Sequence, residues 1–134
     1  MDKRKILYMN DNDEICPVNE TLNLFNRKWI LCIILDLFDG KTHFSEFQEA
    51  NPTLSNFTLS QTLKYMEEKK LITKITHENI RDNTEYQLTK KSRKANRILY
   101  EMTIYALDEL ECSKFTNAKK DKILNRYKKI LEIE

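Results

Sequence analysis

Glycine and proline are scarce in this chain, which has one glycine and two prolines among 134 residues. Phosphate-binding loops and dinucleotide-binding turns need several closely spaced glycines, so the sequence nearly excludes these nucleotide-binding devices. Few helix breakers also leave little material for tight turns. Because 33% of the residues are charged and 40% are hydrophobic, we expect one soluble globular domain in which helices dominate.

The sequence also lacks a secretory signal pattern at its start and an apolar run long enough to span a bilayer. Its three cysteines, Cys16, Cys32 and Cys112, are odd in number and do not have metal-ligand spacing. We interpret them as reduced thiols and expect a cytoplasmic protein that does not associate with membranes. The histidines, His43 and His77, have no acidic cluster at ligand spacing, and no nucleophile has a base nearby. We therefore expect no metal, no cofactor and no enzymatic activity.

Charge is unevenly distributed along the chain, although the net charge is only +2. Residues 12–51 hold three basic and seven acidic residues, whereas residues 64–94 hold nine basic and five acidic residues. A basic segment in a nearly neutral protein indicates a face that meets a polyanion. A solvated lysine-rich surface would give the same pattern, so charge alone does not decide between the two interpretations.

Dense apolar patterning predicts that residues 22–38 form a helix buried on most sides. Residues 26–28 interrupt the pattern and could divide this helix in two. Pro17 suits the first position of a helix and indicates where the segment begins. Gly40 follows the apolar segment where a left-handed C-terminal cap belongs.

Two short helices are predicted next, and Pro52 separates them with a sharp turn. The first contains Phe44 and Phe47, and the second is capped by Ser55 or Asn56. The second helix has a single apolar stripe, formed by Leu59, Leu63 and Met66. Its opposite face is polar and carries Thr58, Gln61, Lys64, Tyr65 and Glu68.

Residues 71–76 and 84–88 are rich in β-branched residues and predict two strands joined as a hairpin by a polar tip with Arg81. A further helix follows around residues 95–106, and a last helix is capped by Thr116 or Asn117. The apolar stripe of the last helix has no obvious partner within one small domain, which favours a dimer.

Helix, short helix, turn, helix and hairpin is the element order of a winged helix-turn-helix. We therefore predict a mostly α protein with a small β-hairpin wing, in the α+β class. Residues 1–14 would be an N-terminal arm, residues 15–110 the winged helix-turn-helix DNA-binding domain, and residues 111–134 a C-terminal dimerisation helix. The polar face of the second short helix could enter a major groove, with Lys74, His77 and Arg81 of the hairpin beside it. Solvated side chains would show the same periodicity.

The chain resembles the HxlR-type winged-helix regulators of bacteria, which are relatives of the MarR type. The resemblance covers roughly residues 14–110. The motifs that carry it are Cys16-Pro17-Val18, Lys28-Trp29, Phe44-x-Glu46-Phe47, Leu59-x-Gln61-x-Leu63 and Glu85-Tyr86-x-Leu88-Thr89. It implies a homodimer that pairs through the N-terminal arm and the C-terminal helices. It also implies a sequence-specific transcriptional regulator bound to a pseudo-palindromic operator in double-stranded DNA.

Position by position, the resemblance adds residues to the DNA-binding set that the periodicity suggests. The complete set is His43, Ser55, Asn56, Phe57, Thr58, Ser60, Gln61, Lys64, Tyr65, Lys74, His77 and Arg81. The sequence departs from the family at several positions, among them Asn83, Thr84 and Ser92, where a proline-containing run and a glycine are usual. His43 replaces a usual arginine, Phe57 replaces a common lysine, and Lys70 replaces a glycine before the wing.

Many members of this family sense oxidants or small electrophiles through the cysteine that matches Cys16. A helix N-terminus stabilises a thiolate, which supports such a redox-sensing role. Nearby acidic residues oppose the thiolate, and Cys16 as a packing residue is the other interpretation. We expect Cys32 to be an inert core residue and Cys112 to lie at the surface or the dimer seam.

A winged-helix protein-interaction module without DNA binding is the alternative function. The weak net charge and the apolar Phe57 in the predicted DNA-binding set favour it.

Overall fold

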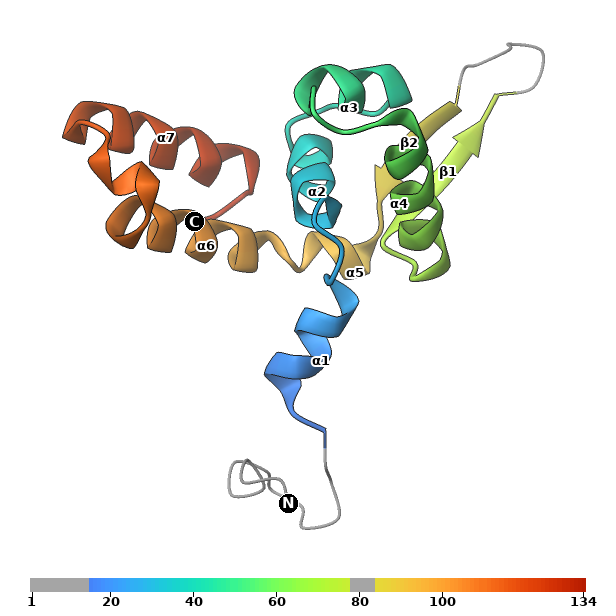
Figure 1. Cartoon of the computed structure of the whole chain (residues 1–134), viewed down its shortest axis with the longest axis horizontal. Coiled ribbons are helices and arrows are strands. Elements are labelled where there is room, and N and C mark those ends of the chain that lie inside the picture. Colours follow the sequence, from blue (N-terminus) through green and yellow to red (C-terminus); the bar gives the residue numbers. More distant parts are fainter. Residues whose placement is uncertain (1–14, 78–83) are drawn as a thin grey trace.

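The computed structural model describes residues 15–77 and 84–134, so residues 1–14 and 78–83 lie outside the described part. The predicted elements appear in the predicted order, joined by two short helices, α5 and η2, that were not predicted (Figure 1). The elements are α1 Pro17–Leu24, α2 Ile30–Phe38, α3 Phe44–Ala50, α4 Asn56–Glu68, β1 Ile72–Thr76, β2 Thr84–Leu88, α5 Lys90–Arg93, α6 Asn96–Glu109, η2 Glu111–Lys114 and α7 Asn117–Ile130. The prediction of a mostly α protein with a two-stranded hairpin is confirmed.

Helix α2 forms the centre of the hydrophobic core. Ile30, Ile33 and Ile34 of this helix have no exposed surface. Buried side chains from the other elements surround them, namely Phe47, Leu54, Leu59, Leu63, Met66, Leu71, Ile72, Tyr86, Leu99 and Leu131. A single core therefore joins the helix-turn-helix, the hairpin and the end of the chain.

Helix α2 ends in the left-handed cap that the sequence predicts. Gly40 has a φ of +96°, which favours glycine because it has no Cβ. The amide of Gly40 donates to the carbonyl of Leu37 at 3.1 Å, and the amide of Lys41 donates to the carbonyl of Asp36 at 3.0 Å. These two bonds satisfy the last carbonyls of α2 and turn the chain toward α3.

Helix α4 begins at the cap that the sequence predicts, and Ser55 rather than Asn56 is the cap residue. The amide of Thr58 donates to Oγ of Ser55 at 3.1 Å. Helix α3 packs beside α4 in the helix-turn-helix, and its Phe47 is fully buried. The turn at Pro52 therefore leads from one packed helix directly into the next.

The hairpin is fixed to the body of the molecule through its second strand. Strands β1 and β2 are antiparallel, with Ile72 opposite Leu88. The amide of Tyr86 donates to the carbonyl of Thr42, ahead of α3, at 2.8 Å. The Tyr86 ring is buried and lies 6.1 Å from the ring of Phe47 between centroids. These contacts set the base of the wing against α3.

The prediction that residues 22–38 are buried on most sides is wrong for the first part of this segment. The chain divides after Leu24, and only α2 enters the core. Helix α1 has no buried residue, and Leu22 is 61% exposed. Figure 1 shows α1 projecting away from the body of the protomer. The prediction treated the two parts as one apolar segment, but α1 has polar residues on every side, whereas Asp36 is the single charged residue of α2.

The C-terminal helices form an arm that leaves the body and returns to it. Helix α6 runs away from α5, η2 reverses the chain, and α7 comes back toward α2 (Figure 1). Leu131, directly after α7, is fully buried, and Nδ2 of Asn96 donates to its carbonyl at 2.8 Å. The last helix therefore has partners within its own protomer, contrary to the expectation that its stripe would lack them.

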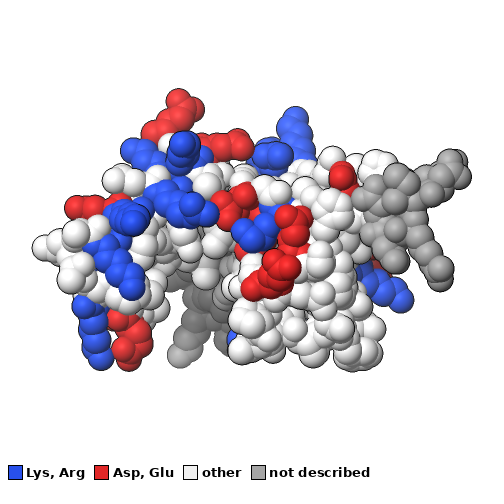
Figure 2. Space-filling view, turned by 90° about the horizontal axis from the view of Figure 1, so that it is seen from above, with Lys and Arg blue, Asp and Glu red and all other residues white. Residues whose placement is uncertain are grey.

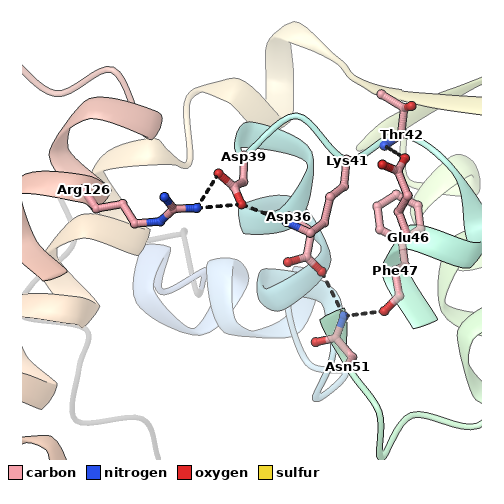
Figure 3. Close-up of polar contacts among 8 residues, drawn as sticks. All are labelled: Asp36, Asp39, Lys41, Thr42, Glu46, Phe47, Asn51 and Arg126. Carbon is pink, nitrogen blue, oxygen red and sulfur yellow. Dashed lines mark hydrogen bonds and ion pairs between the residues drawn. The ribbon is translucent and has the colours of Figure 1, made fainter. Parts of the chain in front are cut away.

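A polar cluster connects this arm to the helix-turn-helix (Figure 3). Nη2 of Arg126 on α7 lies 3.0 and 3.1 Å from the carboxylate oxygens of Asp39, and Nζ of Lys41 donates to the same carboxylate at 2.8 Å. The hydrogen bond from Lys41, together with Arg126, lowers the pKa of Asp39. Nδ2 of Asn51 donates to Asp36 at 2.8 Å, and burial raises the pKa of Asp36.

Helix α4 ends in the same kind of cap as α2, but a lysine occupies the left-handed position. Lys70 has a φ of +61°, and the amide of Leu71 donates to the carbonyl of Met66 at 2.8 Å. A side chain with a Cβ costs about 1–2 kcal/mol in this conformation. The wing therefore begins from a strained residue.

We expect Lys70→Gly to raise the free energy of unfolding by about 0.5–1 kcal/mol, because relief of strain exceeds the backbone entropy that glycine adds. Urea denaturation at matched protein concentration measures the change. Lys69→Gly is the matched control, since Lys69 has a φ of −86° and glycine relieves no strain there. A loss of stability in Lys70→Gly as large as in Lys69→Gly would contradict the prediction.

We expect Asp39→Asn to lower the free energy of unfolding at pH 7 by about 0.5–1 kcal/mol, the size of a solvent-accessible ion pair. The folded-state pKa of Asp39 lies below its unfolded value. Its contribution is therefore present above the unfolded pKa and is lost as pH falls through the folded pKa. Urea denaturation between pH 7 and pH 3 should show the two proteins converging at the acidic end. Asp121→Asn, at an exposed position of α7, is the control; a gap that does not narrow as pH falls from 7 to 3 would rule out this explanation.

Candidate nucleic-acid interface

Helix α4 has two opposite faces, and the buried one determines where the other points. Leu59, Leu63 and Met66 are at most 2% exposed and hold the helix in the core. Phe57, Gln61 and Lys64 follow the same spacing of four and three residues and are all exposed. Since each residue advances by about 100°, Phe57 lies roughly 200° around the helix from Leu59. The outward stripe, by which we mean Phe57, Gln61 and Lys64, therefore faces away from the core.

The N-terminal end of α4 presents further exposed polar groups. Ser55 accepts the amide of Thr58 at its Oγ and donates to Thr58 Oγ1 at 2.9 Å. Oδ1 of Asn56 accepts a hydrogen bond from Nε2 of Gln48 on α3. Ser60 is exposed next to the outward stripe. The structure thus brings together seven of the predicted residues, which are Ser55, Asn56, Phe57, Thr58, Ser60, Gln61 and Lys64.

Tyr65 is placed differently from the other predicted residues of α4. Its side chain is half-buried, and its hydroxyl donates to the carbonyl of Leu24, at the end of α1, at 2.9 Å. The guanidinium of Arg27 lies 4.5 Å from the centre of its ring. Tyr65 therefore connects α4 to the turn after α1 and does not extend the outward stripe. The helical periodicity of α4 could not reveal this partner, which lies 41 residues away in the sequence.

The two histidines meet at one carboxylate at the base of the wing. Nε2 of His43 lies 3.9 Å from Oε1 of Glu85, and Nε2 of His77 lies 3.9 Å from its Oε2. His43 also precedes α3, where Oε1 of Glu46 accepts the amides of Thr42 and His43. These amide bonds, first that of Thr42, lower the pKa of Glu46. Both histidines were predicted from the sequence as DNA-binding residues. Glu85, which lies between them in the fold, was not.

Lys74 lies on the same side of the wing base. It is exposed and lines a cavity of about 470 Å³ whose walls are His43, Phe44, Ser45, Gln48, Lys74, Thr84 and Tyr86. Arg81, which was also predicted to contact DNA, lies outside the described residues. The structure therefore forms two groups of predicted residues, one on α4 and one between α3 and the wing.

The three cysteines occupy different environments. Cys16 directly precedes α1 and is half-buried, in agreement with its predicted place at a helix N-terminus. The prediction that Cys32 lies in the core is wrong, because this residue is exposed. Cys32 and Cys112 both line an apolar groove of about 400 Å³ between α2, α6, η2 and α7. Partial burial in this groove and the nearby Asp36 raise the pKa of Cys32.

Every basic residue that the structure describes in the segment 64–94 is exposed. Figure 2 shows a second accumulation of Lys and Arg over α7, with Asp and Glu among them.

Within residues 15–77 and 84–134, no three His, Cys, Asp or Glu side chains are grouped to hold a metal ion. None of the helices in this described part combines the length and apolar character that crossing a membrane requires.

Comparison with known proteins gives a consistent set of matches. A sequence profile described as HxlR-like helix-turn-helix matches residues 24–114. YdeP of Bacillus subtilis (strain 168), an uncharacterized HTH-type transcriptional regulator, is 28% identical over 118 residues, which are 84% of this chain and 92% of YdeP.

Solved structures match over most of their length as well. The redox regulator HypR in its oxidized form superimposes with a TM-score of 0.66 and 25% identity, over 72% of this chain and 96% of HypR. Quinone-bound YodB from B. subtilis superimposes with a TM-score of 0.58 and 27% identity, over 69% of this chain and 97% of YodB. The winged helix-turn-helix arrangement described above is therefore shared with transcriptional regulators.

Proposed function

Because the chain belongs to the HxlR-like helix-turn-helix family of transcriptional regulators, we propose that it binds double-stranded DNA sequence-specifically through α4. The observation that carries this proposal is the exposed outward stripe of α4, held away from the core by the buried stripe on its other side. A helix of this kind fits a major groove, where glutamine can bond adenine and lysine can meet phosphate or guanine. Family and relatives are regulators of transcription rather than enzymes.

The remaining predicted residues would contact the DNA beside the groove. Ser55 and Asn56 lie at the N-terminal end of α4, from which phosphate contacts are common. His43, Lys74 and His77 lie at the wing base and would meet the flanking backbone. The carboxylate of Glu85 lies 3.9 Å from a ring nitrogen of each histidine.

The functional unit is a homodimer on a pseudo-palindromic operator. Large apolar side chains remain exposed on two parts of the protomer, namely Ile15, Val18 and Leu22 around α1 and Ile98, Met102, Tyr105 and Leu110 along α6. Burying such faces against a second copy is a strong driving force for association. Residues 1–14 and 111–134 would contribute to this dimer as arm and C-terminal helix, with residues 15–110 as the DNA-binding domain.

Regulation would act through Cys16, which would react with an oxidant or a small electrophile. HypR is described as a redox regulator, and YodB has been observed bound to a quinone. Cys16 precedes α1, and the end of α1 accepts the hydroxyl of Tyr65 on α4. A chemical change at Cys16 that displaces α1 would therefore act on the helix that carries the outward stripe.

We expect Gln61→Ala to weaken binding to the selected operator about tenfold or more, because a bidentate contact to a base is lost. Lys64→Ala should weaken binding and reduce the slope of log affinity against log salt by about 1, because one phosphate contact is lost. Fluorescence anisotropy with duplexes selected from random DNA measures both effects. Lys128→Ala, at an exposed position of α7, is the matched control and should bind as the wild type does.

Unchanged affinity in both α4 variants would show that α4 is not the recognition helix. Failure of the wild-type protein to enrich any duplex would favour the alternative, a winged-helix protein-interaction module.

We expect a quinone or a peroxide to reduce the operator affinity of the wild-type protein and to leave that of Cys16→Ser unchanged, because the reactive thiol is lost. Cys32→Ser and Cys112→Ser are matched controls and should respond as the wild type does. Tyr65→Phe should still be modified at Cys16, as mass spectrometry would show, but should respond less because α1 is no longer bonded to α4. Equal responses of wild type and Cys16→Ser would refute the sensor role.

A further inference from the structure

Phe57 is the most exposed of the large apolar residues that the described part of the chain leaves at the surface, with a relative exposure of 74%. The other exposed apolar side chains lie near or on α1 and α6, where a second copy of the chain would cover them. Phe57 stands alone on α4, among polar residues. Neither the core nor the proposed dimer therefore accounts for a phenylalanine at this position.

The direction of Phe57 is fixed by the helix that carries it. It belongs to the outward stripe with Gln61 and Lys64, one turn closer to the N-terminal end of α4. A helix that enters the major groove brings such a residue to the base edges. A phenyl ring offers no hydrogen-bond donor or acceptor, so its contact with the bases has to be apolar.

The major groove offers one apolar group among the four normal bases, the 5-methyl group of thymine. The other base edges in that groove present hydrogen-bond donors and acceptors, which a phenyl ring would desolvate without replacing their bonds. Thymine is therefore the base that an exposed phenylalanine on a recognition helix can favour.

We infer that Phe57 is a specificity-determining residue that contacts the 5-methyl group of a thymine in each half of the operator. This inference rests on the proposed function, since it requires α4 to lie in the major groove. It adds a base preference that comes from apolar contact, beside the hydrogen bonds expected from Gln61. 5-Methylcytosine carries the same methyl group, so the experiment compares the two sources.

The test uses the full chain and duplexes that the wild-type protein selects from random DNA. Each thymidine in the selected duplex is replaced in turn by deoxyuridine, which removes the methyl group and keeps every hydrogen-bonding atom of the base. We expect one position in each half-site at which this change weakens wild-type binding about fourfold, the effect of removing one buried methyl group. Phe57→Ala should bind the thymidine duplex more weakly and should be indifferent to deoxyuridine there.

Gln61→Ala is the matched control, because it removes a polar member of the same stripe. It should bind more weakly overall and still lose about fourfold on the change from thymidine to deoxyuridine. At the same position, a 5-methylcytosine·guanine pair should bind the wild type more tightly than a cytosine·guanine pair, and Phe57→Ala should not distinguish them.

Two results would overturn the inference while the proposed function stands. One is an enriched duplex in which no thymidine is sensitive to loss of its methyl group. The other is a sensitive position at which Phe57→Ala and the wild type lose the same factor, because another residue then contacts the methyl group. If no duplex is enriched at all, the proposed function itself fails.

Discussion

The burial of one stripe of α4 is the constraint on which the rest of this structure depends. Leu59, Leu63 and Met66 lie in the core, and burying one such side chain contributes about 1.5–3 kcal/mol. Three of them together approach the whole net stability of a typical domain, which is about 5–15 kcal/mol. Rotating α4 to hide its polar side would forfeit that contribution. The helix therefore has one allowed orientation, and the opposite face is presented outward as a consequence.

The parts of the fold that the sequence predicts are those set by local chemistry. The caps at Gly40 and Ser55 depend on a left-handed residue and on one hydroxyl, both readable from the sequence. The buried and exposed stripes of α4 follow from helical periodicity, and the two strands follow from β-branched residues around a polar tip. Lys70 illustrates the limit of local rules, because it adopts the left-handed conformation without being glycine. The packing of Leu71 after it fixes the chain there despite the strain.

The features that the sequence could not predict all depend on partners distant in the chain. Leu24, at the end of the mostly polar α1, still packs against the core, because the chain folds back beside α4 there. Cys32 faces a groove that exists only because the C-terminal arm returns beside α2. Leu131 enters a core whose other members lie at least 30 residues earlier. The residues next to Glu85 in the sequence do not indicate a partner for it. Its carboxylate approaches both histidines only in the folded chain.

The position of Tyr65 bounds how strongly α1 can influence α4. A single hydrogen bond such as that from the Tyr65 hydroxyl to Leu24 contributes about 0.5–1.5 kcal/mol. Since about 1.4 kcal/mol corresponds to a factor of ten in affinity, breaking this contact alone could change DNA binding by roughly tenfold at most. Helix α1 has no buried residue in the protomer, so whatever covers its apolar face also determines its position. A regulatory effect much larger than tenfold would therefore have to come from moving the two protomers relative to each other, with α1 as part of their contact.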